Sequence, residues 1–164
     1  MARTPHKLDR IDRRILEALQ SDGGLTNQEL AERVGLSPSP CLRRVRALED
    51  AGIIRSRTTL LDQKALGLDL TVMLQISMDR HTPERFENFE DTVRRFPEVQ
   101  LCYLVTGQEA DYLLKVVVPD MDAYQQFLLG KITRIEGVSG VHSSFVMRKV
   151  IESTAVPLDY LTHP

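Results

Sequence analysis

The stretch GLSPSPCLRRVRALEDAGII, residues 35–54, decides how the front of this chain folds. A residue that precedes proline avoids the α region, so Ser39 as N-cap and Pro40 at the first helical position predict a helix start. Ser37-Pro38 offers the same signal two residues earlier and remains an alternative. Gly52 supplies a stop, because glycine tolerates the left-handed conformation that commonly ends a helix.

This helix has two sides of different chemistry. The spacing of its apolar residues predicts a side that faces a core. The core-facing residues are Leu42, Val45 and Leu48, with Cys41 at the edge. The side opposite the core carries Ser39, Arg43 and Arg46, with Arg44 at the other border. We therefore expect a helix with an apolar inner side and a basic outer side.

Two further helices precede it. LDRIDRRILEALQ, residues 8–20, repeats apolar residues at helical spacing, and Asp9 can cap its start. In LTNQELAERVG, residues 25–35, Thr26 and Glu29 have the spacing of a capping box. The short connection from Gly35 to the third helix matches a helix-turn-helix. IIRSRTTLLD, residues 53–62, then predicts a strand or short hairpin in the place of a wing.

The charge of the chain is distributed unevenly. Residues 1–60 hold eleven Lys/Arg against eight Asp/Glu, a net +3, whereas residues 61–164 are net −5 and the whole chain is −2. A run of arginines is commonly a solvated face, but the helix-turn-helix pattern and the hydroxyl-rich helix start favour DNA phosphates and bases. The expected contacts to double-stranded DNA are Thr26, Asn27, Gln28, Ser37, Ser39, Pro40, Arg43, Arg44, Arg46, Arg55 and Arg57.

The rear of the chain alternates strand and helix patterns. Strands are predicted at 70–78, 99–107, 111–119 and 141–151, and helices begin after Thr82 and Asp120. The order βαββαβ predicts a ferredoxin-like sandwich, and the whole chain is α+β. We expect a helix-turn-helix domain at 1–60, a linker at 61–69, the βαββαβ domain at 70–151 and a tail at 152–164. The sheet face without helices, carrying Met73, Leu104, Leu114 or their alternates, predicts a homo-oligomer.

Several classes of protein find no support in the sequence. Cys41 and Cys102 lie far apart in apolar settings and are interpreted as reduced core residues, which suggests a cytoplasmic protein. The four histidines are scattered, and no Cys-x-x-Cys or His-Glu-x-x-His motif is present. No signal peptide or membrane span is indicated. We expect no metal, no cofactor, no membrane partner and no enzymatic activity.

Four segments together carry a resemblance to a known family. They are LDRIDRRILEALQSDG, LTNQELAERVGLSPSPCLRRVRALEDAGII, LVTGQEADYLLKVVVPDMDAY and VHSSFVMRKV. The chain resembles the Lrp/AsnC, or feast/famine, transcription regulators, in particular their leucine-responsive branch. The resemblance implies homodimers that pair through the rear sheets and assemble into tetramers or octamers. It also implies an amino-acid effector, such as leucine or methionine, bound between dimers.

The resemblance also implies the effector-binding residues. They are Leu104, Thr106, Gly107, Asp111, Met121, Ser144, Phe145 and Val146, and we add Gln108 and Glu109 of the same loop as candidates. The family often shows Gly-Asp-x-Asp-Tyr, whereas this loop is one residue longer and its first acid is displaced. Glu109 or Asp111 could accept hydrogen bonds from an ammonium, and a glycine loop lets backbone N–H groups approach a carboxylate. Without the family, the residues favour a structural interpretation, with Gly107 in a hairpin turn, Asp111 as a surface acid and the apolar residues as sheet core.

Other functions remain as alternatives. Haem-pathway decarboxylases share a similar two-domain architecture, so the fold alone does not exclude an enzyme. A constitutive architectural DNA-binding protein would need no effector, and a pure ligand-binding module would need no front domain. The retained arginines favour a sequence-specific transcription regulator that responds to a small effector.

Overall fold

The computed structural model describes residues 8–107 and 109–160. These residues form two compact units, one made of the chain up to Leu60 together with the segment from Ile151 onward, and the other spanning Leu61–Val150. The C-terminal segment from Ile151 therefore belongs to the first unit. As a separate point, none of the helices within the described ranges has the length and apolar content needed to cross a bilayer.

The first unit is a bundle of three short helices. They are α1 (Arg10–Ser21), α2 (Asn27–Val34) and α3 (Pro38–Asp50), with a 3-10 turn η2 (Leu158–Tyr160) from the C-terminal segment. The capping box that the sequence predicts at Thr26 and Glu29 is confirmed, and Asp9 caps α1. Gly35 ends α2 with φ of 71°, a left-handed conformation that glycine adopts without strain.

The third helix begins at the earlier of the two predicted starts. Ser37 is the N-cap and Pro38 is the first helical residue, so Ser39 lies inside the first turn. Cys41, Val45 and Leu48 are buried in the core of this unit, as expected from their spacing. Leu42 was expected to face the same core, but it lies on the outer side with 37% of its surface exposed.

The segment after α3 differs from the expected wing. Residues 53–62 contain no strand in the described structure, and the next strand begins only at Leu70. A two-stranded ribbon without further packing is marginally stable, because few of its side chains are buried. Ile54 packs against the core of the helices, but Leu60 and Leu61 are each 71% exposed.

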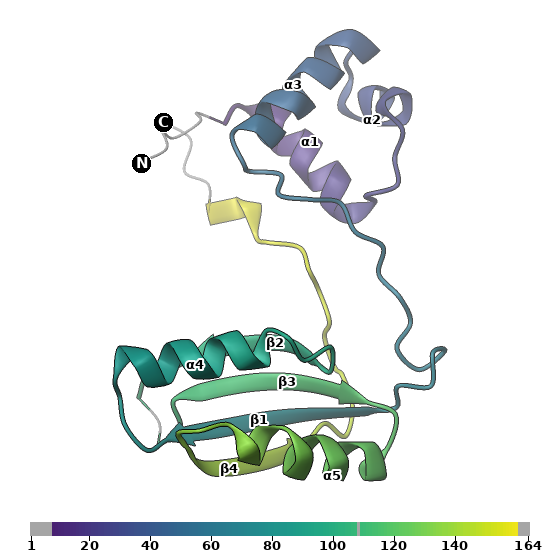
Figure 1. The fold of residues 1–164 in the computed structure, drawn as a ribbon. Coiled ribbons are helices and arrows are strands. Elements are labelled where there is room, and N and C mark those ends of the chain that lie inside the picture. The colour runs from purple at the N-terminus through teal and green to yellow at the C-terminus, as the bar shows by residue number, and fades with distance from the viewer. Residues whose placement is uncertain (1–7, 108, 161–164) are drawn as a thin grey trace. The chain divides into compact units, whose positions relative to one another are not determined.

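The second unit is a four-stranded antiparallel sheet covered on one face by two helices (Figure 1). Its elements are β1 (Leu70–Met78), α4 (Pro83–Val93), β2 (Val99–Leu104), β3 (Tyr112–Val118), α5 (Met121–Gly130), η1 (Ile132–Arg134) and β4 (Val138–Phe145). The strand order β2-β3-β1-β4 is that of the expected ferredoxin-like sandwich, so the α+β fold is confirmed. The last strand begins three residues earlier and ends six residues earlier than its pattern suggested.

The core of this unit lies between the sheet and its helices. Alternate residues of β1, from Val72 to Met78, pack against Phe89 of α4 and Phe127 of α5. Leu114 was expected on the face without helices, but it is fully buried in this core. The opposite face carries Met73, which is half-buried, and Tyr103, which is 57% exposed.

The C-terminal segment packs along α1. The side-chain amide of Gln20 accepts a hydrogen bond from the N–H of Val156 at 2.7 Å and donates one to its carbonyl at 3.2 Å. Asp159 forms an ion pair with Arg13, and Leu158 packs against the helical core. The sequence pattern contained no sign of these contacts, which lie between residues more than 130 positions apart.

Candidate DNA interface and effector site

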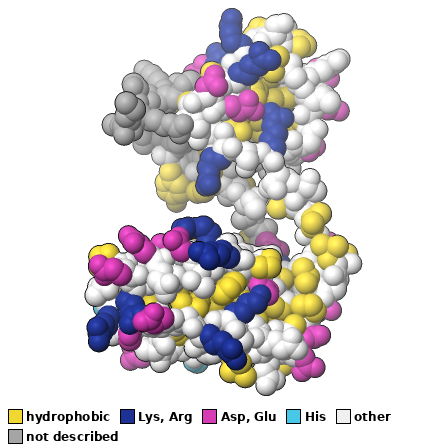
Figure 2. Space-filling view, viewed as in Figure 1, with side chains coloured by type: hydrophobic (Ala, Val, Ile, Leu, Met, Phe, Trp, Pro, Cys, Tyr) yellow, Lys and Arg dark blue, Asp and Glu magenta, His cyan; other side chains and the backbone are white. Residues whose placement is uncertain are grey.

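The outer side of α3 is an exposed basic stripe. Arg43 and Arg46 are exposed, and neither forms an ion pair or hydrogen bond with any residue in the described ranges. Ser37 and Ser39 are exposed at the start of the helix, and because the proline that follows each of them carries no N–H, their hydroxyls are the main donors of this turn. Figure 2 shows several basic side chains on the visible face of the first unit, with acidic ones among them. The two arginines and the two serines can contact phosphates or base edges without first breaking an internal bond.

Arg44 lies on the border of α3 and is engaged inside the unit. Its Nη1 donates to Asp9 Oδ2 at 2.7 Å and to Asp12 Oδ1 at 2.8 Å. The Asp12 side chain is only 7% exposed, so this arginine neutralises a buried carboxylate that belongs to α1. The pairing raises the pKa of Arg44, chiefly through its hydrogen bond to Asp12. The sequence assigned Arg44 to DNA, and in the structure its guanidinium joins α1 to α3.

The start of α2 holds three residues expected to contact DNA, and two of them, Thr26 and Asn27, make local hydrogen bonds. The Thr26 hydroxyl donates to Glu29 Oε2 at 2.7 Å and accepts the Glu29 N–H at 3.3 Å. Asn27 donates to the Pro38 carbonyl at 2.9 Å, which ties α2 to the first turn of α3. The exposed Gln28 makes only a long 3.4 Å contact to Glu32, so its amide remains accessible.

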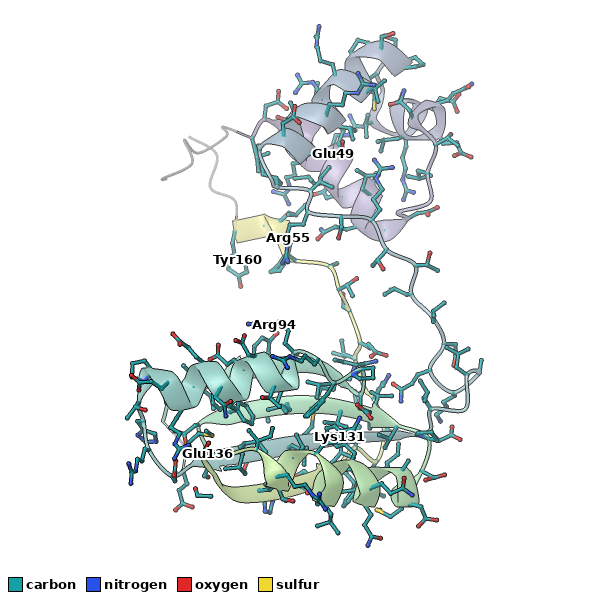
Figure 3. All side chains as sticks on the ribbon, viewed as in Figure 1. Glu49, Arg55, Arg94, Lys131, Glu136 and Tyr160 are labelled. Carbon is teal, nitrogen blue, oxygen red and sulfur yellow. The ribbon has the colours of Figure 1, made fainter. Side chains whose placement is uncertain are left out.

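The segment after α3 presents two arginines. Arg57 lies 3.6 Å from Glu49 in the last turn of α3, a distance typical of a loose surface pair. Arg55 is exposed and pairs with no acid among residues 8–107 and 109–160 (Figure 3). Both side chains are therefore accessible for contacts to a phosphate backbone.

The expected effector residues of the second unit fall into two groups. Leu104 to Asp111 lie at the end of the sheet where Tyr112 pairs with Ile76. Met121 and the residues at the end of β4 lie at the opposite end, where Val118 pairs with Leu70. Six residues of extended chain, roughly 20 Å, separate the two groups along β3 (Figure 1). One copy of the chain therefore does not bring all of these residues into one pocket.

The first group is the loop before β3. Gly107 has φ of 82° and open space around its Cα, and Thr106 and Glu109 are exposed. Asp111 is different, because both of its carboxylate oxygens are engaged. Oδ2 accepts the Met78 N–H at 2.7 Å and Oδ1 lies 2.8 Å from His81 Nε2. Gln108 lies outside the described residues.

The second group surrounds the end of β4. The Phe145 ring packs edge-to-face on Tyr124 of α5 with centroids 5.5 Å apart, yet it remains 42% exposed. Met121 is 52% exposed in the first turn of α5, and Ser144 points to the sheet face without helices. Val146 continues the strand pairing through a hydrogen bond from its N–H to the Thr71 carbonyl at 3.0 Å. The group thus offers an apolar surface that is open on one side.

Burial acts on the two cysteine thiols and on the hydroxyl of one buried tyrosine. Burial raises the pKa of the Cys102 thiol to about 11, and burial also raises the pKa of Cys41. Burial, with a hydrogen bond to Glu90, raises the pKa of Tyr112. Both cysteines are free, and the described ranges hold no cluster of three acids, histidines or cysteines able to bind a metal.

The fold and these two surfaces define a DNA-binding protein with a separate ligand-binding domain. The family model for a winged helix-turn-helix DNA-binding domain matches residues 8–55, and the model for the Lrp/AsnC ligand-binding domain matches residues 71–156. The leucine-responsive regulatory proteins of Klebsiella pneumoniae and Escherichia coli are each 47% identical over 146 residues, covering 89% of this chain and 88% of theirs.

Solved structures agree with the sequence relatives. A transcriptional regulator of Neisseria meningitidis, determined as its L-Met complex, is 43% identical with a TM-score of 0.90, covering 94% of this chain and 99% of that one. An AsnC family regulator of Agrobacterium tumefaciens is 42% identical with a TM-score of 0.89, covering 94% and 100%. The chain belongs to the Lrp/AsnC family. It is a DNA-binding transcriptional regulator whose relatives are named as regulators rather than enzymes.

Proposed function

We propose that this regulator responds to an amino acid with an apolar side chain, such as leucine or methionine, at a site built from two copies of the chain. The observation that carries the proposal is the separation of the two residue groups at opposite ends of β3. A loop with open glycine backbone suits a carboxylate, and the exposed apolar group at Phe145 and Met121 suits a side chain. The leucine-responsive names of two relatives and the L-Met complex of a third support the choice of ligand.

We assign the ammonium contact to Glu109. Its side chain is exposed beside Gly107, whereas the oxygens of Asp111 already accept the Met78 N–H and contact His81. Asp111 then holds the shape of the loop and does not touch the ligand. Replacing Glu109 by Gln should weaken amino-acid binding without changing thermal stability. Replacing Asp111 by Ala should lower both the amino-acid affinity and the thermal stability.

The DNA interface is assigned to the outer stripe of α3, with Arg43 and Arg46 at its centre and Arg55 and Arg57 on the backbone. In a dimer that pairs through the sheet face without helices, two such helices would enter successive major grooves, about 34 Å apart. Tetramers or octamers would bring the two halves of the effector site together. The effector would then change the number of DNA sites held by one assembly, and bound DNA would change effector affinity by the same factor.

Binding by mixed copies tests the shared site. Thr106→Trp blocks the loop half and Met121→Trp blocks the apolar half, and both positions are exposed, so neither change should lower stability. A thermal-shift screen against the twenty amino acids first identifies the effector of the parent protein. Each variant alone should then fail to bind it, while assemblies refolded from an equal mixture should recover part of the binding. If the mixture binds no better than either variant, the shared site is wrong.

A further inference from the structure

The outer stripe of α3 contains an apolar side chain that the core does not explain. Leu42 is 37% exposed, although the adjacent Cys41 is fully buried on the inner side of the same helix. Ala47 is exposed on the same stripe. With Ser39, Arg43, Arg46 and Asp50 they line a shallow hollow of about 400 Å³. The hollow thus combines apolar groups with two arginines.

This combination matches one feature of the DNA major groove. The groove edges of the bases present hydrogen-bonding atoms and a single kind of apolar group, the C5-methyl of thymine. An arginine reads guanine through O6 and N7, while an apolar side chain contacts the thymine methyl. We propose that Leu42 reads a thymine methyl next to the bases or phosphates contacted by Arg43 and Arg46. This inference rests on the proposed DNA interface and adds a specificity determinant to it.

The charges on α3 favour DNA over a protein as the occupant of the hollow. The hollow is lined by two arginines, Arg43 and Arg46, against one acid, Asp50, because Arg44 is paired with acids of α1. An apolar protein surface over Leu42 would remove water from Arg43 and Arg46 without offering them acceptors, which is costly. Phosphate and guanine oxygens supply those acceptors while the methyl group covers the leucine.

Replacing thymine by deoxyuracil tests the inference, because it deletes the methyl group and keeps every hydrogen-bonding atom. Duplexes selected from a random library by the full-length parent protein provide the probe. In the strongest duplex, uracil at each thymine in turn should reveal at least one position at which the parent loses affinity about fourfold, the equivalent of about 0.8 kcal/mol for one buried methyl. Leu42→Ala should bind that duplex more weakly and should lose nothing further on the change to uracil.

Two control variants separate the possible results. Leu129→Ala removes a leucine that is 54% exposed in the second unit and should keep the parent's sensitivity to uracil. Arg43→Ala should weaken binding to every duplex, and if it does not, the proposed DNA interface itself fails. If Arg43→Ala weakens binding but Leu42→Ala responds to uracil as the parent does, only the role of Leu42 fails. The role of Leu42 is also overturned if the selected duplexes contain no thymine, or if the parent protein binds equally well after every change of thymine to uracil.

Discussion

Replacing Arg44 by methionine should destabilise the three-helix unit, while the same change at Arg43 should not. Methionine keeps most of the aliphatic stem and removes the guanidinium from both positions. Arg44 neutralises Asp12, whose side chain is 7% exposed, and also contacts Asp9, whose side chain is 50% exposed. Arg43 has no such partner in the described residues. The two adjacent arginines of one helix thus provide a matched pair.

The magnitude follows from the burial of the groups involved. A hydrogen bond to a charged buried group contributes about 1.5–3 kcal/mol, and an exposed pair such as that with Asp9 adds less than about 1 kcal/mol. Because the Arg44 side chain is itself 31% exposed, water replaces part of what is lost. We therefore expect a loss of about 2 kcal/mol for Arg44→Met and less than about 0.5 kcal/mol for Arg43→Met.

Hydrogen exchange of the backbone amides in α1 and α3 measures this loss inside the full-length chain. A destabilisation of about 2 kcal/mol should speed exchange in these helices by roughly 30-fold while β1 and β3 keep their rates. Salt-dependent DNA binding supplies the second readout, in which Arg43→Met should weaken binding and reduce the salt slope by about one. If Arg44→Met leaves exchange unchanged and weakens DNA binding as much as Arg43→Met, the structural role of Arg44 is refuted.

Three further outcomes are expected. Gly35→Ala should cost about 1 kcal/mol by thermal unfolding, because φ is 71° there, whereas Gly130→Ala in the last turn of α5 should be neutral or stabilising. The backbone hydrogen bond from Asp12 is the largest cause that lowers the Asp9 pKa below its ordinary 3.8. The ionised Asp9 therefore contributes to the free energy of unfolding above pH 3.8, and this contribution is lost as pH falls through the lowered pKa. In Asp9→Asn, the free energy of unfolding measured against pH should consequently fall less steeply at acid pH than in the parent. Gln20→Ala removes both hydrogen bonds to Val156 and should increase proteolysis of the C-terminal segment at neutral pH.

The local features of the DNA-binding unit could be predicted because their causes are close in sequence. The capping box at Thr26 and the left-handed Gly35 depend on residues within one or two turns. The inner side of α3 follows from helical spacing, which correctly places Val45 and Leu48 in the core. Leu42 was misplaced because it lies at the border of that spacing, where the position of the neighbouring helices decides which side is covered.

The spatial arrangement of the expected effector residues could not be predicted, because a family pattern gives positions along the chain and not distances. Sequence alone could not show that Asp111 already holds the Met78 N–H, since these residues are 33 positions apart. Sequence alone also could not show that the loop at Gly107 and the Phe145 side chain lie at opposite ends of the sheet. The register of β3 against β1 fixes that separation, and register depends on which strand faces pack against the helices.

The sequence by itself determined the three front helices, the βαββαβ order and the basic helix, because periodicity, capping and charge are properties of short segments. The tertiary structure alone decided which arginines of that helix are free. Arg44 meets an acid 32 residues away, while Arg43 and Arg46 meet none in the described chain. It also decided that the C-terminal segment packs along α1. Such contacts join distant parts of the chain, and the energies that select them come from burial, which only the folded arrangement defines.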